Sequence, residues 1–374
     1  MTKAKKLPVL SPSIHTFEMV GEYSDNKANS RIFESIKKLV NEEKYRQIHY
    51  NGATENSYTY KRIGGGLKIK LSSYPKHGKY YITLSGVNLA RIAGEPSRLA
   101  LTELSPRGLA CQEEIFLAEL KNLGILDVED SITWKMKRVD ITQDFYVKSD
   151  PTLLMKVVRH AGKVEPYRKG HEDHHNQHNE MRSCTFRRDA YDFELYDKHE
   201  QLSAEEEKGY PIRSEDIAAS KNLVRYEIQL KRKYLKDFES ENLDGMGVKL
   251  KNHALLCYFE KLGKAMPAIL YQCAYEMFGA HPWYHASGAL EQLNESDLDK
   301  ETQKLLRSYI EVANNADEPV KFSYRKKKQI KAALDVLEIN TVIIPDRILN
   351  KRQYARFPVA PIYSRVQEID NEGT

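Results

Sequence analysis

Several features that would assign a protein to a specialised class are missing from this chain of 374 residues. Its four cysteines (Cys111, Cys184, Cys257 and Cys273) form no Cys-x-x-Cys pair, which argues against a zinc ribbon or a thiol redox motif. No apolar run approaches the roughly 18 residues of a membrane span. The N-terminus contains lysines but lacks the apolar stretch of a signal peptide. We therefore expect a protein of the reducing cytoplasm that does not enter a membrane.

The chain also lacks a strong excess of one charge, an internal repeat and a long low-complexity tract. Its net charge of +5 permits binding to nucleic acid but does not indicate it. The hydrophobic content of 41% and charged content of 30% fit a soluble globular protein. The length is sufficient for a sizeable core and more than one domain.

The first 125 residues predict an antiparallel sheet backed by helices. Ser105 and Pro106 have the residue types of a helix N-cap and first turn. Gly64, Gly65 and Gly66 are interpreted as a hairpin turn, because no Gly-Lys-Ser/Thr follows them as in a phosphate-binding loop. Strand-like segments lie at residues 14–20, 45–50, 58–63, 67–71 and 80–84.

Three later segments alternate apolar and polar residues, as a strand with one buried face does. We expect these strands, at 134–147, 191–198 and 223–230, to share one sheet and to build one site. Their predicted outward faces carry Arg138, Asp140, Thr142 and Asp144, then Asp192, Glu194, Tyr196 and Lys198, then Arg225, Glu227 and Gln229. Tyr191, five residues before Tyr196, is predicted to face the core instead.

The outward residues are the types that phosphoryl transfer requires. Carboxylates such as Asp140, Glu227 and Asp144 can bind a divalent metal, which polarises a phosphodiester. A tyrosine hydroxyl such as that of Tyr196 can attack phosphorus and form a covalent phosphotyrosine. A nearby Lys198 could lower the pKa of the tyrosine or neutralise the phosphate. The competing interpretation is that acids on an exposed strand face are simply solvated.

The residues that carry these features resemble a known family, the gene-two nicking proteins that initiate replication in filamentous bacteriophages. The segments 222–238 and 195–200 resemble its glutamate and tyrosine strands, and Arg138-Val139-Asp140-Ile141-Thr142 resembles its aspartate strand. The order and rough spacing of all three agree over about residues 80–240. Rolling-circle plasmid initiators use a similar set of strands.

The resemblance implies an α+β fold in which an antiparallel sheet carries the site and a helical region follows. It implies a Mg²⁺-dependent (or Mn²⁺-dependent) nickase and strand-transferase that starts rolling-circle replication. Such a protein cuts one strand of a double-stranded origin, stays joined to the 5′ end through tyrosine, and later rejoins the displaced single strand. Tyr196 matches the nucleophile, while Asp140 and Glu227 match the metal ligands. Host helicase and polymerase are the further partners implied.

Two further groups of residues have alternative interpretations. The histidine-rich segment His171 to His178 lacks the His-apolar-His pattern of many rolling-circle nickases, so we expect a polar loop rather than a metal site. The basic residues near the predicted strands could contact DNA phosphates or could form a solvated surface. They are Arg187, Arg188, Arg225, Lys231, Arg232 and Lys233, with Arg325–Lys328 further along.

These observations predict three regions, which are an N-terminal α+β region at 1–125, a catalytic nickase region at 126–245, and a helical C-terminal region with a basic tail at 246–374. The alternative of another class is a non-catalytic DNA-binding regulator with the same fold. A third interpretation is a metal-dependent nuclease that forms no covalent intermediate. The joint presence of Tyr196, Asp140 and Glu227 favours the nickase.

Overall fold

A computed structural model of the chain describes residues 11–346, except 49–56, 75–76, 148–150, 153, 156–170, 176–180, 244–247, 251–252, 279–280, 282 and 316–321. Its main feature is a ten-stranded sheet in the order β2-β3-β4-β5-β1-β6-β10-β9-β8-β7, with every neighbouring pair antiparallel. The strands are β1 Ser13–Tyr23, β2 Tyr45–Ile48, β3 Ser57–Arg62, β4 Lys68–Tyr74, β5 Lys79–Val87, β6 Thr133–Tyr146, β7 His171–His175, β8 Met181–Arg187, β9 Tyr191–Asp197 and β10 Leu223–Lys231.

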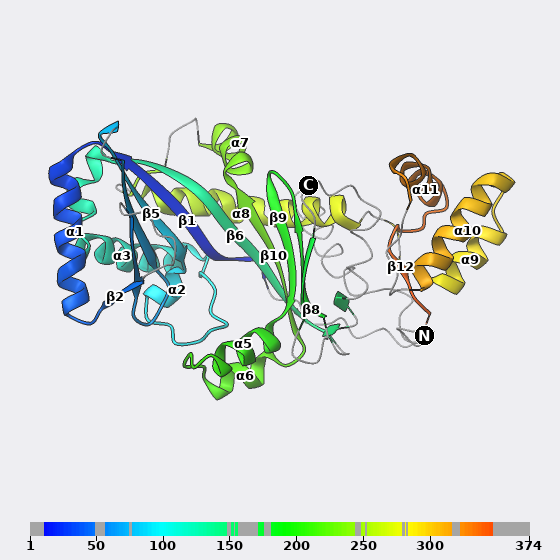
Figure 1. Cartoon of the computed structure of the whole chain (residues 1–374), viewed down its shortest axis with the longest axis horizontal. Helices are drawn as coiled ribbons and strands as arrows, with labels where there is room; N and C mark the ends of the chain where they lie inside the picture. The colour runs from blue at the N-terminus through cyan, green and yellow to red at the C-terminus, as the bar shows by residue number, and fades with distance from the viewer. Residues whose placement is uncertain are drawn as a thin grey trace.

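One face of this sheet is packed by helices. Phe17 of β1 is fully buried and contacts Phe116 of α3 and Phe259 of α8, with ring centroids 5.9 and 5.0 Å apart. Burying each such ring stabilises the fold by about 1.5–3 kcal/mol. Figure 1 shows α8 passing behind β9 and β10, where the hydroxyl of Tyr226 donates to the Leu270 carbonyl. The helices of this part are α1 Asn26–Asn41, α2 Leu89–Ile92, α3 Pro106–Asn122, α7 Arg232–Asn242 and α8 Ala254–Phe278.

The expected start of α3 is confirmed. Ser105 is its N-cap, its hydroxyl accepts from the Gly108 amide, and Pro106 occupies the first turn. The helix ends before Gly124, whose φ of +70° is a backbone conformation that glycine adopts without strain. The predicted α+β class, with an antiparallel sheet backed by helices, is likewise confirmed.

A second apolar cluster lies in the C-terminal helices. Leu293, Leu306, Ile310, Ile330 and Leu334 are fully buried there. This cluster is built from α9 Ala286–Asn294, α10 Lys300–Asn314, α11 Tyr324–Val336 and the short strands β11 Tyr284–His285 and β12 Ile343–Ile344. The helical character expected for this region is confirmed, whereas the division at 125/126 and 245/246 stays a prediction.

Local structure differs from expectation in three places. β9 ends at Asp197, which caps α5 (Lys198–Glu207), so Lys198 is helical rather than on the strand. Ser203 is therefore inside that helix, where its hydroxyl donates to the His199 carbonyl, and does not begin it. Residues His171–His175, expected in a loop, form β7. The predicted helix at 151–160 and basic tail from Lys351 lie largely or wholly outside the described residues.

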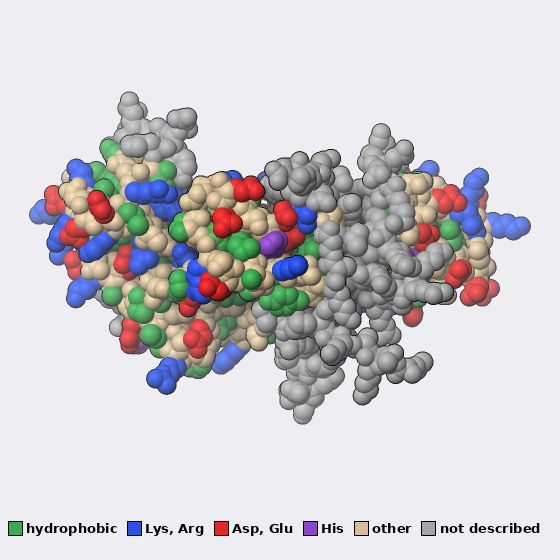
Figure 2. Space-filling view, turned by 90° about the horizontal axis from the view of Figure 1, so that it is seen from below, with side chains coloured by type: hydrophobic (Ala, Val, Ile, Leu, Met, Phe, Trp, Pro, Cys, Tyr) green, Lys and Arg blue, Asp and Glu red, His purple; other side chains and the backbone are tan. Residues whose placement is uncertain are grey.

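On the side of the molecule shown in Figure 2, acidic and basic side chains are interspersed, as a net charge of only +5 would suggest. Within the described ranges, no helix has both the length and the apolar character needed to cross a membrane.

Candidate active site

The three alternating strands are neighbours, as predicted, with β10 between β6 and β9. Residues directly opposite one another in an antiparallel ladder point to the same face of a sheet. The register therefore places three rows of side chains on the face away from the main helices. These rows are Asp144–Arg225–Tyr196, Thr142–Glu227–Glu194 and Asp140–Gln229–Asp192, from β6, β10 and β9 respectively.

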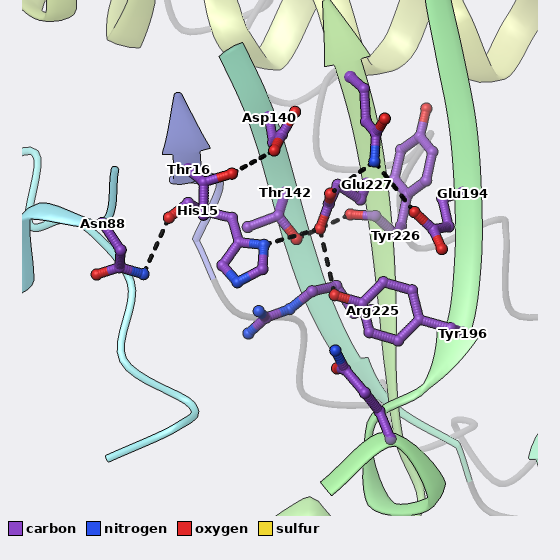
Figure 3. A network of polar contacts seen from close by, with 12 residues as sticks. His15, Thr16, Asn88, Asp140, Thr142, Glu194, Tyr196, Arg225, Tyr226 and Glu227 are labelled. Atoms are coloured by element: carbon purple, nitrogen blue, oxygen red, sulfur yellow. Dashed lines mark hydrogen bonds and ion pairs between the residues drawn. The ribbon is translucent and has the colours of Figure 1, made fainter. Parts of the chain in front are cut away.

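Glu227 is at the centre of a hydrogen-bond network on this face (Figure 3). Its Oε2 accepts from the Tyr196 hydroxyl at 3.2 Å and lies 3.0 Å from Nδ1 of His15. Its Oε1 accepts from the Gln229 amide at 3.3 Å, and that same amide reaches Glu194 at 3.2 Å. The tyrosine is thereby held with its hydroxyl toward three strands, and its side chain is 7% exposed.

His15 reaches the site because of a β-bulge in β1. Ile14 pairs with Ile141 but Thr16 pairs with Asp140, so β1 contains one extra residue at His15. The bulge turns both His15 and Thr16 toward the site while Ile14 and Phe17 stay in the core. The sequence interpretation missed His15, because alternation alone gives a bulge no signal.

Asp140 is buried and paired with side chains on its own and the neighbouring strand. The Thr16 hydroxyl donates to its Oδ2, and the Arg138 guanidinium lies 2.9 Å from its Oδ1. Thr16 and Arg138 are further site residues absent from the predicted set. The Arg-x-Asp spacing on a strand was a usable signal for Arg138, because residues two apart share a face.

The carboxylates of the site shift one another's pKa. Burial, and then the charge of Glu227, raises the pKa of Asp140 to about 7, against the effects of Arg138 and Thr16. The same two causes raise the pKa of Glu194 to about 7. Burial also opposes the charged form of Glu227, but the effects of His15, Arg225 and Gln229 outweigh it and lower this pKa to about 2. Glu227 is thus the carboxylate that stays ionised.

Tyr196 is not activated in this state of the protein. Burial, and then the nearby negative charge of Glu227, raises its pKa well above the usual value. Arg225 opposes this effect and is the cation that favours the phenolate. Lys198, expected in that role, instead donates to Gln201 at 2.8 Å, with its ammonium group 5.7 Å from the centre of the Tyr196 ring. Burial, and then the charge of Arg225, lowers the pKa of Lys198 to about 7.

Asp144 and Arg225 differ most from their predicted roles. The guanidinium donates two hydrogen bonds of 2.7 Å to the two carboxylate oxygens, and both side chains are buried. A carboxylate held in this bidentate manner has its charge compensated by the arginine, and Arg225 has no exposed surface for DNA. We therefore assign this pair to support of the site rather than to metal or DNA contact.

The other basic residues predicted to contact DNA are mostly engaged in ion pairs. Lys231 lies 2.5 Å from Asp192, Arg232 lies 2.7 Å from Glu239, and Arg188 lies 2.6 Å from Glu276. Lys233 and Arg187 are exposed. Their contact with DNA stays a prediction. Tyr191 faces the core as predicted, and its hydroxyl donates to Glu276 at 2.6 Å.

A cavity of about 610 Å³ opens over this face. Asp140, Glu194 and Glu227 line it together with Tyr196, so its oxygen donors are of the type that Mg²⁺ prefers. Among the residues that the structure describes, no three His, Cys, Asp or Glu side chains are gathered as a formed metal centre. The donor chemistry thus fits a divalent cation, held from strands β6 and β10.

Comparison with known families gives one match on this part of the chain. Residues 108–253, which include β6, β9 and β10, match a family model for the N-terminal part of the phage replication-associated protein encoded by gene two. The match confirms the resemblance to filamentous-phage replication proteins and covers the three strands that carry the site.

Two further comparisons add less. A solved structure titled "Structure of Rolling Circle Replication Initiator Protein from Geobacillus stearothermophilus" aligns with 61% of this chain and 77% of its own, at 13% sequence identity and a TM-score of 0.32. An alignment of this quality establishes no function. A search of the curated proteins finds no match.

Proposed function

We propose that this protein is a site-specific DNA nickase and strand-transferase that initiates rolling-circle replication of phage or plasmid DNA. One observation carries the proposal. In the segment that matches the family model, the Tyr196 hydroxyl is bonded to the ionised Glu227 in a cavity that Asp140 also lines. A tyrosine beside two carboxylates on separate strands suits attack on a phosphodiester better than it suits a purely structural role.

The reaction we propose is a transesterification. The Tyr196 oxygen forms a bond to phosphorus while the bond between phosphorus and the 3′ oxygen breaks. The tyrosine loses one proton and the released 3′ oxygen gains one, so the step is balanced without water or an oxidant. Glu227 accepts the hydrogen bond of the attacking hydroxyl, and Arg225 favours the phenolate that develops. The reverse reaction, with the displaced strand's 3′ hydroxyl as nucleophile, closes the circle.

Asp140 and Glu227 are the residues that we propose to hold Mg²⁺ or Mn²⁺, with Glu194 beside them. When bound, the ion would neutralise charge that develops on the phosphate oxygens. The mutual repulsion that raises the pKa of Asp140 and Glu194 is the condition that a cation would relieve. The partners would be duplex origin DNA, the displaced single strand, and the host helicase and polymerase.

The test is incubation with supercoiled origin DNA and Mg²⁺, followed by denaturing electrophoresis to detect protein joined to a labelled 5′ end. Tyr196→Phe is expected to bind the DNA and form no adduct. Tyr191→Phe is the matched control, because this tyrosine is on the same strand but faces the core. An adduct that persists in Tyr196→Phe would show that the nucleophile is another residue.

The same assay separates the rival functions. Asp140→Asn and Glu227→Gln are expected to lose metal-dependent nicking and keep the fold. Nicking without any protein-bound 5′ label would support a nuclease that forms no covalent intermediate. DNA binding with no nicking in the parent protein would support a regulator.

A further inference from the structure

The open face of the sheet continues beyond the candidate site, onto strands outside the segment that matches the family model. Two more hollows lie along it. The first, of about 400 Å³, shares Gly86 and Arg138 with the active-site cavity. The second, of about 620 Å³, lies further from the site over β4, β5 and β1, where Lys70, Thr83 and Val20 lie side by side. From Gly86 to Lys79, the path along β5 is roughly 23 Å.

The chemistry of this face is basic and aromatic. In β6 an extra residue between Arg138 and Met136 turns both Lys137 and Arg138 outward. The lining of the second hollow, as described, includes no carboxylate. Its polar and aromatic residues are Lys70, Ser72, Tyr74, His77, Lys79, Tyr81, Thr83 and Lys137.

The acids on the same face are already compensated. Glu18 lies 2.6 Å from Lys137, and Glu22 lies 2.5 Å from Lys79. The exposed lysines Lys70 and Lys135 flank Val20 on either side in the ladder. This leaves the face with a net positive charge, which complements a polyanion.

Two tyrosines distinguish among the polyanions. Tyr74 is 53% exposed, and its ring meets that of Tyr81 edge to face with centroids 5.5 Å apart. Exposed aromatic rings between lysines on an open sheet form a stacking platform for unpaired bases, whereas the bases of a duplex are already stacked on one another. We propose that the face over β4, β5 and β1 binds the single-stranded DNA that leads away from Tyr196. This inference rests on the proposed function, because that function supplies the single strand.

The experiment measures binding of a labelled oligothymidylate to the full chain in EDTA, so that no cleavage contributes. We expect Tyr81→Ala and Tyr74→Ala each to weaken binding on the order of tenfold. Lys70→Ala and Lys135→Ala are each expected to reduce the slope of log affinity against log salt by about 0.7. Lys121→Ala, which removes an exposed lysine from α3 on the helical side, is the matched control.

Unchanged oligothymidylate binding in all four variants would overturn the proposal. Equal competition by a duplex of the same length would also overturn it, because the face would then take paired DNA. Neither outcome depends on covalent chemistry. If Tyr196→Phe still forms the adduct while the groove variants bind weakly, the nucleophile assignment fails and the single-strand face stands. If the adduct behaves as expected while the groove variants bind normally, only the single-strand face fails.

Discussion

The hydroxyl of Tyr196 and the carboxylate of Glu227 are joined across two neighbouring strands by a hydrogen bond of 3.2 Å, and His15 holds the same carboxylate oxygen from a third strand. One oxygen atom thus orients the tyrosine and receives the imidazole. Because Glu227 keeps its charge through these contacts, any change to His15 reaches the tyrosine through the protonation of Glu227.

Replacing His15 is therefore expected to slow adduct formation. His15→Ala removes a contact that lowers the pKa of Glu227, so that pKa should rise and the acid limb of the rate profile should move to higher pH. Loss of such a supporting contact lowers activity by about 10- to 100-fold. The measurement is the rate of adduct formation from pH 4 to pH 9. His15→Gln, which can keep a donor near Glu227, should retain more activity, and equal losses in both variants would contradict this role.

Breaking the buried pair of Asp144 and Arg225 is expected to destabilise the protein. Arg225→Met leaves an uncompensated buried carboxylate, and removing one partner of such a pair costs about 3–5 kcal/mol. Chemical denaturation followed by tryptophan fluorescence measures this loss. The double variant Asp144→Leu/Arg225→Met should recover part of it. If the double variant is no more stable than Arg225→Met, desolvation is not the cause. Arg213→Ala, at an exposed ion pair, should change the midpoint little.

Stability is expected to depend on pH through Glu194. Its pKa is raised from an unfolded value of about 4.3 to about 7, so between these values the folded state binds more protons than the unfolded state. Stability is therefore lost as pH rises through this window. Glu194→Gln should gain about 1–2 kcal/mol relative to the parent between pH 5 and pH 8, a figure reduced for partial solvent screening.

The measurement is denaturation in EDTA at both pH values, with Glu215→Gln, at an exposed carboxylate of α6 (Ser214–Ser220), as control. A parent-to-variant difference that is the same at pH 5 and pH 8 would show that Glu194 does not keep its proton in the folded state. The burial of Asp140 acts in the same direction, so the slope of the variant should be reduced rather than abolished.

Periodicity was sufficient to predict the sheet and the faces of its central strands, because alternation depends only on which side of a strand each residue occupies. It correctly separated Tyr196 from Tyr191 and brought Asp140 and Glu227 to one face. It did not predict His15, since a bulge in β1 depends on the partner strand. Nor did it separate Asp144 from Asp140, because two carboxylates on one face differ only in whether a cation such as Arg225 lies opposite.

The position of β9 has a mechanical consequence. This strand is inside the sheet, bonded to β10 on one side and to β8 on the other. A DNA end joined covalently to Tyr196 and pulled by an advancing helicase would transmit its tension to both ladders at once. Hydrogen bonds aligned across a strand share a load applied along it, so the anchorage would resist being peeled away. The tyrosine is thus attached where the sheet can carry force as well as perform chemistry.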